Sequence, residues 1–163
     1  MIKKNNLLKI LGITFLLFSF YAAFKFREDN NFKDFLFIIT ICILTDVGGY
    51  IFGKLFKGPK LTKISPKKTY AGVFGGFLFS LIAGLFVYKY KYIDLFLYNG
   101  FYFLIIILFI SLISQVGDLI ISYFKRKAKL KDTGKIIPGH GGLLDRIDGM
   151  IFVFPIFYLI LIL

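Results

Sequence analysis

The chain has 163 residues, of which 58% are hydrophobic and 22 are phenylalanine, and its formal net charge is +12 at pH 7. Soluble domains rarely have such a composition, and apolar runs of membrane length are the expected cause. The positive charge does not indicate a nucleic-acid-binding protein, because no basic patch stands apart from the apolar runs. The single cysteine, Cys42, excludes an intrachain disulfide.

Five apolar runs each come close to the ~20 residues that a helix needs to cross a bilayer. The first run is longer than the core of a signal peptide, so we interpret it as a retained span. Backbone groups in lipid must be hydrogen-bonded within the protein, which favours helices over open strands. The predicted fold class is therefore an all-α, polytopic membrane helical bundle, a single domain over 1–163 with a polar cleft in its cytoplasmic half. The predicted spans are about 7–26, 32–56, 71–88, 101–124 and 142–163.

The basic residues indicate how this bundle lies in the membrane. Sixteen of the 21 Lys and Arg residues fall at the N-terminus, in the loop between the second and third spans, and in the connection between the fourth and fifth. Because cytoplasmic loops carry an excess of Lys and Arg, this predicts a cytoplasmic N-terminus, two cytoplasmic basic loops and an external C-terminus.

Four aspartates lie where apolar sequence would make a charge costly. Asp46 and Asp118 come about eight and seven residues before the cytoplasmic ends of the second and fourth spans, which places both ~10–12 Å deep. Asp145 and Asp148 fall in the first turns of the predicted fifth span, and their i, i+3 spacing puts them on one helix face. The spacing predicts that the four carboxylates meet in one layer.

Converging carboxylates inside a membrane need compensation, since each costs several kcal/mol. A hard divalent cation such as Mg²⁺ would supply it, because Mg²⁺ takes carboxylate oxygens and keeps waters for a phosphate substrate. The alternative is that each aspartate forms an ion pair with a nearby Lys or Arg and has only a structural role. Four acids at one depth favour a metal or phosphate site.

The fourth span carries a polar stripe at i, i+4, i+7 and i+11, formed by Ser111, Gln115, Asp118 and Ser122. Such a stripe faces protein or a water-filled cleft rather than lipid. Hydrogen bonding between helices is the simpler explanation for the serines and the glutamine. Asp118 favours a cleft.

The second and third spans contain clustered glycines, which predict close helix packing. These are Gly48, Gly49, Gly53, Gly72, Gly75 and Gly76. Between them, Pro66 suits the start of a helix, with Ser65 or Thr69 as its cap. Free backbone N–H groups, the helix dipole, Lys67 and Lys68 together suit a phosphate, although positive-inside charge alone would also explain the two lysines.

The polar stretch before the fifth span contains the only histidine, His140, flanked by Gly139, Gly141 and Gly142. These glycines allow close backbone approach. We expect His140 to contact phosphate or brace the loop rather than transfer protons. One histidine and one distant cysteine do not form a zinc site.

Residues Ser122–Asp148, SYFKRKAKLKDTGKIIPGHGGLLDRID, resemble the signature of the phosphatidate cytidylyltransferase (CDP-diacylglycerol synthase) family. Its fixed positions are Ser, two residues, Lys-Arg, four residues, Lys-Asp, then Pro-Gly-His-Gly-Gly and Asp-Arg-x-Asp, and all are present. Thr45–Phe56, Lys60–Gly76 and Ser114–Ser122 agree in order, so the resemblance covers roughly Leu36 to the C-terminus. Family members usually carry further N-terminal spans, so the chain resembles a short form.

The resemblance implies a multi-pass enzyme of the bacterial inner (plasma) membrane, with CTP and phosphatidate as substrates, membrane lipids around it and Mg²⁺ as cofactor. It implies metal binding by Asp118 and Asp145, with Asp148 adjacent and Asp46 as the intramembrane acid. Catalytic and substrate-binding roles are then expected for the basic and polar residues around them, namely Lys68, Lys125, Arg126, Ser122, Lys67, Ser65, Thr69, His140, Gly141, Gly142, Arg146 and Gln115.

In the expected reaction the lipid phosphate attacks the α-phosphorus of CTP, with no general base, and the lysines and arginines balance the phosphate charge. Four acids would also accommodate a second cation. The alternatives are a CTP-dependent polyprenol or lipid kinase, a non-enzymatic membrane carrier and an inactive paralogue. A homodimer is a further alternative for its assembly, and nucleic acid is not an expected partner.

Overall fold

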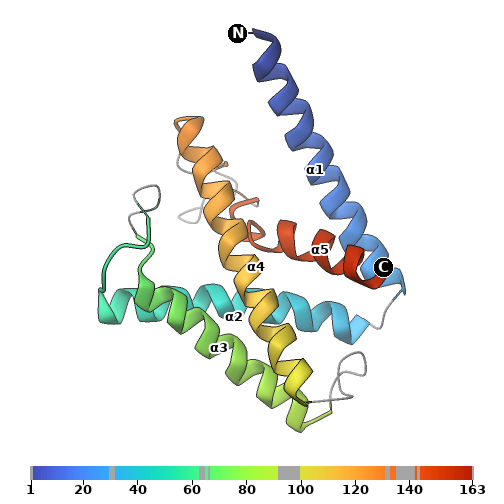
Figure 1. The fold of residues 1–163 in the computed structure, drawn as a ribbon, viewed down its shortest axis with the longest axis vertical. Coiled ribbons are helices and arrows are strands. Elements are labelled where there is room, and N and C mark those ends of the chain that lie inside the picture. The colour runs from blue at the N-terminus through green and yellow to red at the C-terminus, as the bar shows by residue number, and fades with distance from the viewer. Residues whose placement is uncertain are drawn as a thin grey trace.

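The structure, a computed structural model, describes residues 2–29, 32–62, 65, 67–91, 100–130, 133–134, 142 and 144–162. Its helices are α1 (Ile2–Asp29), α2 (Phe32–Phe56), α3 (Tyr70–Lys89), α4 (Gly100–Lys127), the 3₁₀ turn η1 (Leu144–Arg146) and α5 (Met150–Ile162) (Figure 1). Within these residues the chain forms no β-strand, and one isolated bridge joins Lys60 to Thr69. The predicted all-α fold class is confirmed.

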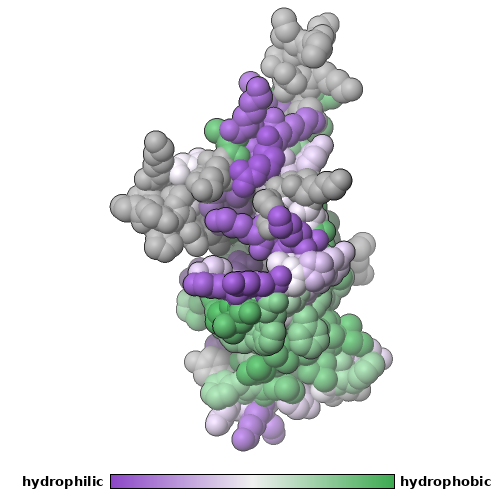
Figure 2. Space-filling model, turned by 90° about the vertical axis from the view of Figure 1, so that its left-hand side faces the viewer, coloured by the Kyte–Doolittle hydropathy of each residue, from purple (hydrophilic) through white to green (hydrophobic). Residues whose placement is uncertain are grey.

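Four of the helices are long and apolar enough to cross a membrane, over Lys9–Asp29, Phe32–Phe56, Tyr70–Lys89 and Gly100–Lys127. The second span has the predicted bounds, and the helices of the first, third and fourth extend beyond theirs. Seen from the side of the loop between α2 and α3, hydrophilic side chains gather over the upper part of the molecule and a hydrophobic band lies below them (Figure 2). The chain is a multi-pass membrane protein in which hydrophilic side chains lie on both sides of an apolar band, most of them on the side of this loop.

The glycines of α2 and α3 bring these two helices into direct backbone contact. A Cβ added to Gly48 would collide with the carbonyl oxygen of Gly75 and with Phe79, and one added to Gly72 would lie 2.8 Å from the carbonyl oxygen of Gly49. The predicted close packing of these glycines is confirmed. The loop that joins these two helices rises from one end of the pair (Figure 1), and its Lys68 reaches Asp118 of α4.

The apolar core lies between α1, α2, α4 and α5, with α1 against α5 and α4 against both α2 and α5. Its largest fully buried side chains are Phe26 from α1, Ile38 and Ile41 from α2, and Phe103 and Ile107 from α4. Phe154 of α5 stacks on Phe35 of α2 with 5.1 Å between ring centroids. This core fixes the position of α4, which carries the polar stripe.

The fifth apolar segment differs from the prediction, because its helix begins at Met150 rather than near residue 142. At ~1.5 Å per residue its 13 residues span ~20 Å, less than the ~30 Å hydrocarbon core of a bilayer. The N–H of Gly142 donates to the Asp145 carboxylate, and η1 follows in place of a continuous helix. Asp145 and Asp148 therefore lie before α5, not in its first turns.

Replacing Gly48 with alanine tests the packing of α2 against α3. Because the added methyl group meets the backbone of α3, we expect Gly48→Ala to destabilise the protein by about 1–3 kcal/mol and to lower its unfolding temperature in detergent. Gly12→Ala on α1 is the matched control, since a Cβ there meets nothing within 4 Å. Equal unfolding temperatures for the two variants would contradict the packing.

Candidate active site

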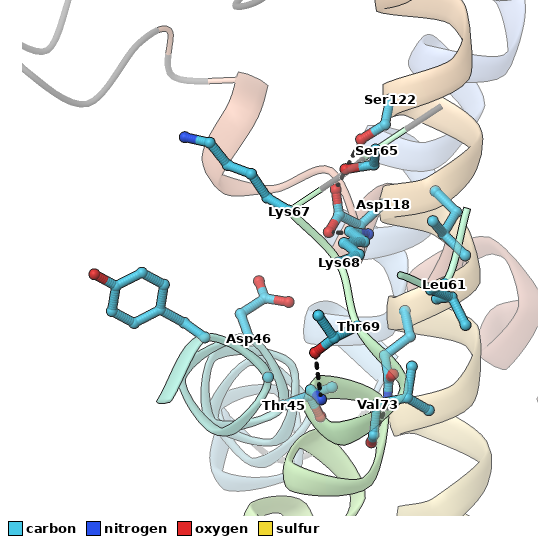
Figure 3. A pocket seen from close by; sticks show the side chains of 15 residues that line it. Thr45, Asp46, Leu61, Ser65, Lys67, Lys68, Thr69, Val73, Asp118 and Ser122 are labelled. Carbon is cyan, nitrogen blue, oxygen red and sulfur yellow. Dashed lines mark hydrogen bonds and ion pairs between the residues drawn. The ribbon is translucent and has the colours of Figure 1, made fainter. Parts of the chain in front are cut away.

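A pocket of about 290 Å³ lies between α2, the start of α3, α4 and the loop that joins α2 to α3 (Figure 3). Acidic, basic, hydroxyl and amide side chains all reach it. The residues that line it are Thr45, Asp46, Gly49, Tyr50, Leu61, Ser65, Lys67, Lys68, Thr69, Gly72, Val73, Gln115, Asp118, Leu119 and Ser122. The predicted polar cleft is present, and eight of the predicted site residues line it.

The loop before α3 is held in place by its own hydrogen bonds. Thr69 caps α3, because its hydroxyl accepts from the Gly72 N–H at 3.1 Å. The Lys68 carbonyl accepts from Leu61 N–H at 2.8 Å, and the Lys68 N–H donates to the Ser65 carbonyl at 3.0 Å. The predicted cap at Thr69 is confirmed, but α3 begins at Tyr70, so the two lysines precede the helix and Pro66 lies outside the described residues.

Lys68 crosses the pocket and forms an ion pair with Asp118 of α4 (Figure 3). Both side chains are partly buried, with exposed fractions of 25% for Lys68 and 30% for Asp118. The neighbouring Lys67 is exposed and extends away from this pair (Figure 3). Asp46 points into the pocket from α2, on the opposite wall. The pocket is therefore lined by carboxylates from two helices, α2 and α4, and by two neighbouring lysines of the loop before α3, of which Lys68 pairs with Asp118.

The polar stripe of α4 contacts neighbouring helices at one end and lines the pocket at the other. Thr45 donates to Ser111 at 3.0 Å, and Gln115 Nε2 donates to Ser111 at 3.3 Å and to the Val73 carbonyl at 3.5 Å. One turn later, the Ser122 hydroxyl donates to Asp118 at 3.4 Å. Ser111 and Gln115 form hydrogen bonds to neighbouring helices, as the simpler explanation of the stripe predicts, while Gln115, Asp118 and Ser122 line the pocket.

Lys125, one turn beyond Ser122, is the centre of a second charged group. Its Nζ lies 2.9 Å from Asp145 Oδ1 and 2.7 Å from Asp148 Oδ2, and the three side chains are between 6% and 14% exposed. A buried ammonium between two carboxylates joins the end of α4 to the segment before α5. This bridge was not predicted, because the sequence gives no indication of which lysine reaches which acid.

Asp145 is surrounded by donors. Besides Lys125, it accepts from the backbone N–H of Gly142 at 2.8 Å and of Thr133 at 2.9 Å. Burial acts most strongly and would raise its pKa, but these hydrogen bonds and the Lys125 charge together outweigh burial and lower the pKa to about 2. Asp145 is therefore ionised at any physiological pH and holds the preceding segment in place.

The pKa of Asp148 is shifted in the opposite direction, upward. Burial raises its pKa, and the charges of Asp118 and Asp145 add to this rise, while Lys125 only partly opposes it. Its Oδ1 atom is buried and has no hydrogen-bond partner among the described residues. A buried carboxylate oxygen without a hydrogen-bond donor is costly. This oxygen of Asp148, which lies close enough to Asp118 to be affected by its charge, could bind a cation.

The donor chemistry suits a hard cation, since carboxylate oxygens are the ligands that Mg²⁺ prefers and Asp148 keeps one oxygen unsatisfied. In the part of the chain that the structure describes, however, no three acids, histidines or cysteines lie close enough to hold a metal ion together. Lys68 and Lys125 stand beside the carboxylates instead. The assignment of Asp46, Asp118, Asp145 and Asp148 as metal ligands stays a prediction.

Several predicted residues lie away from the pocket. Arg126 is exposed and donates to the Leu130 carbonyl at 3.3 Å. Gly142 contributes its N–H to Asp145. His140, Gly141 and the Arg146 side chain lie outside the described residues. Conversely, Tyr50 lines the pocket without having been predicted, although its i+4 spacing from Asp46 places both on one face of α2.

Known proteins resemble this chain over nearly its whole length. The model of the cytidylyltransferase family matches residues 3–163. The phosphatidate cytidylyltransferase of Staphylococcus epidermidis is 38% identical over 154 residues, which are 94% of this chain and 58% of that protein. The proteins of the same name from Rickettsia felis and Rickettsia prowazekii are 44% and 42% identical over 147 and 163 residues. These cover 86% and 96% of this chain, and 64% and 70% of the two relatives.

Removing the charge of Lys125 tests whether its ion pairs with Asp145 and Asp148 hold the end of α4 to the segment before α5. Because Lys125→Met leaves two buried carboxylates without their cation, we expect a loss of roughly 3 kcal/mol in unfolding free energy, measured in detergent with a chelator present. Lys127→Met is the control, since Lys127 is exposed on the same helical turn. If the two variants unfold alike, the bridge has no structural role.

Proposed function

The chain belongs to the cytidylyltransferase family, and we propose that it is a phosphatidate cytidylyltransferase. A phosphate oxygen of phosphatidate forms a bond with the α-phosphorus of CTP, and the bond from that phosphorus to the bridging oxygen breaks. The products are CDP-diacylglycerol and pyrophosphate. The observation that carries this proposal is the polar pocket at one end of an apolar bundle, where Lys68 meets Asp118 between three helices. The names of the three relatives support the same reaction.

The chain's own residues supply charge and position. Lys68 is within reach of both the pocket and Asp118, so it transfers its contact from the carboxylate to a phosphate group when substrate enters. Lys67 is exposed at the pocket rim and attracts the same anions. The phosphate of the lipid is ionised at neutral pH and is itself the nucleophile, so no residue is needed to remove a proton. The roles of Ser65, Ser122 and Thr69 are to orient phosphate oxygens through their hydroxyls.

We propose Mg²⁺ as the cofactor, held by Asp118 and Asp145 with Asp148 and Asp46 adjacent, and a second cation at the remaining oxygens. When bound, the cation supplies charge neutralisation to the triphosphate. Asp118 would hold the cation through the carboxylate that now pairs with Lys68. Asp148 would hold it through the buried Oδ1 atom, which has no donor among the described residues. Arg126, Arg146 and His140 remain proposed phosphate contacts.

Two other functions are less well supported. A CTP-dependent lipid kinase would transfer the γ-phosphate and release CDP, and a carrier would convert nothing. Relatives at 38% to 44% identity are named for the cytidylyl transfer, and the signature over Ser122–Asp148 has all its fixed positions.

The proposed location is the bacterial inner membrane, with the N-terminus and the pocket loops in the cytoplasm, and the proposed assembly includes a homodimer.

The central test is formation of CDP-diacylglycerol from labelled CTP, phosphatidate and Mg²⁺ by the purified protein. Asp118→Asn and Asp145→Asn should each lower the rate by roughly 100-fold or more, because each removes a charge that the reaction uses. Chelation of Mg²⁺ should stop the unmodified protein, and added Mg²⁺ should restore it. Asp29→Asn is the control, since Asp29 is exposed at the far end of α1. Normal turnover in either variant would refute the role of that aspartate, and release of CDP would indicate the kinase.

Membrane orientation is tested by cysteine labelling in intact bacterial cells. The only native cysteine, Cys42, is buried, so it contributes little background. We expect Lys67→Cys to resist a membrane-impermeant maleimide until the cells are opened, because the pocket loop is proposed to be cytoplasmic. Lys91→Cys, exposed at the opposite end of the bundle, should react in intact cells. The reverse pattern would overturn the orientation.

A further inference from the structure

A second hollow lies on the outer side of the seam between α3 and α4, apart from the polar pocket. It measures about 400 Å³ and is lined by Phe77 of α3 and by Ile105, Leu108, Phe109 and Leu112 of α4. All five side chains are apolar. The four from α4 recur at i, i+3, i+4 and i+7, so they form one stripe along the helix. We call this hollow the apolar groove.

The apolar groove continues the polar pocket along the same two helices. On α3, Val73 lines the pocket and Phe77, one turn further on, lines the groove. On α4, Gln115 and Leu119 line the pocket and Leu112 lines the groove, so the two hollows are ~4.5 Å apart along the helix at their nearest lining positions. A molecule with a polar end in the pocket would therefore find an open apolar groove beside it.

Gln115 lies between the polar pocket and the apolar groove. Its Nε2 donates to the Val73 carbonyl of α3 and to Ser111, so this amide group is already hydrogen-bonded within the protein. Beyond it the side chains that line the groove offer no hydrogen-bonding group. An occupant of the groove must therefore be apolar over its whole length, since a polar group there would lack a partner.

We propose that the apolar groove holds an acyl chain of the phosphatidate whose phosphate lies in the polar pocket. This inference rests on the proposed function, because it takes its occupant from that reaction. Ile105 and Leu112 are seven residues apart, so the groove runs for ~10 Å along α4, the direction that a lipid chain takes when its headgroup stays at the membrane surface. Leu108, Phe109 and Leu112 then contact the chain and influence which acyl chains are accepted.

Bulk lipid would also cover an apolar surface, so the test must separate bound phosphatidate from the surrounding bilayer. The chain contains no tryptophan, which makes a single introduced tryptophan the only indole reporter. In Phe109→Trp the new ring replaces another aromatic ring in the groove, where Phe109 is 40% exposed. The protein is placed in unbrominated phosphatidylcholine vesicles that contain a small fraction of either dibromo-acyl phosphatidate or dibromo-acyl phosphatidylcholine.

Phe20→Trp is the matched control. Phe20 is 55% exposed on α1 and lies nine residues from Asp29, at the end of α1, just as Phe109 lies nine residues from Gly100 at the start of α4. Both are therefore exposed phenylalanines nine residues inside a membrane-length helix, and Phe20 does not line the groove. Leu112→Trp is a second reporter in the groove. It gives the same measurement if the Phe109→Trp protein fails to insert into the vesicles.

We expect brominated phosphatidate to quench the groove tryptophan several-fold more than the same fraction of brominated phosphatidylcholine, and to show no such preference at Phe20→Trp. Equal quenching by the two lipids at both groove positions would mean that bulk lipid fills the groove, and would overturn the proposal. The measurement needs no turnover. Normal CDP-diacylglycerol synthesis without a phosphatidate preference therefore refutes the groove alone, and a phosphatidate preference without synthesis refutes the proposed reaction alone.

Discussion

The ion pairs of Lys68 with Asp118 and of Lys125 with Asp145 and Asp148 are the interactions on which the rest of the site depends. Carboxylates beside apolar helices are tolerated when a cation or solvent compensates them. Here the cations come from the loop before α3 and from the end of α4, so each pair also fixes a connecting segment. In the proposed reaction, a lysine that turned to phosphate would leave its carboxylate available to a divalent cation.

The amphipathic character of the proposed substrate matches the division of the bundle. Charged and hydroxyl groups collect at the pocket, where α2, α3 and α4 meet, and the groove beyond Gln115 is lined by apolar side chains only. The glycines of α2 and α3 allow this arrangement, since larger side chains at Gly48 or Gly72 would push the helices apart and displace the pocket loop from α4. Helix packing and substrate position are therefore linked through a few small residues.

Much of this organisation follows from the sequence. Apolar run length predicted the long helices, glycine clusters predicted the contact of α2 with α3, and the spacing of Asp118 and Ser122 placed both on the pocket face. The start of α5 was predicted wrongly, because Asp145 accepts backbone N–H groups from Gly142 and Thr133 and so favours a turn over a helix. The lysine partners were not predictable, since long flexible side chains reach acids that are far away in the sequence.

The most direct test of this account is an experimental structure of the protein with CTP and Mg²⁺ bound. The account predicts that carboxylate oxygens of Asp118 and Asp145 lie ~2.1 Å from the cation, with the ammonium groups of Lys68 and Lys125 turned toward phosphate oxygens. A structure in which both lysines keep their aspartate partners while the nucleotide binds elsewhere would contradict it.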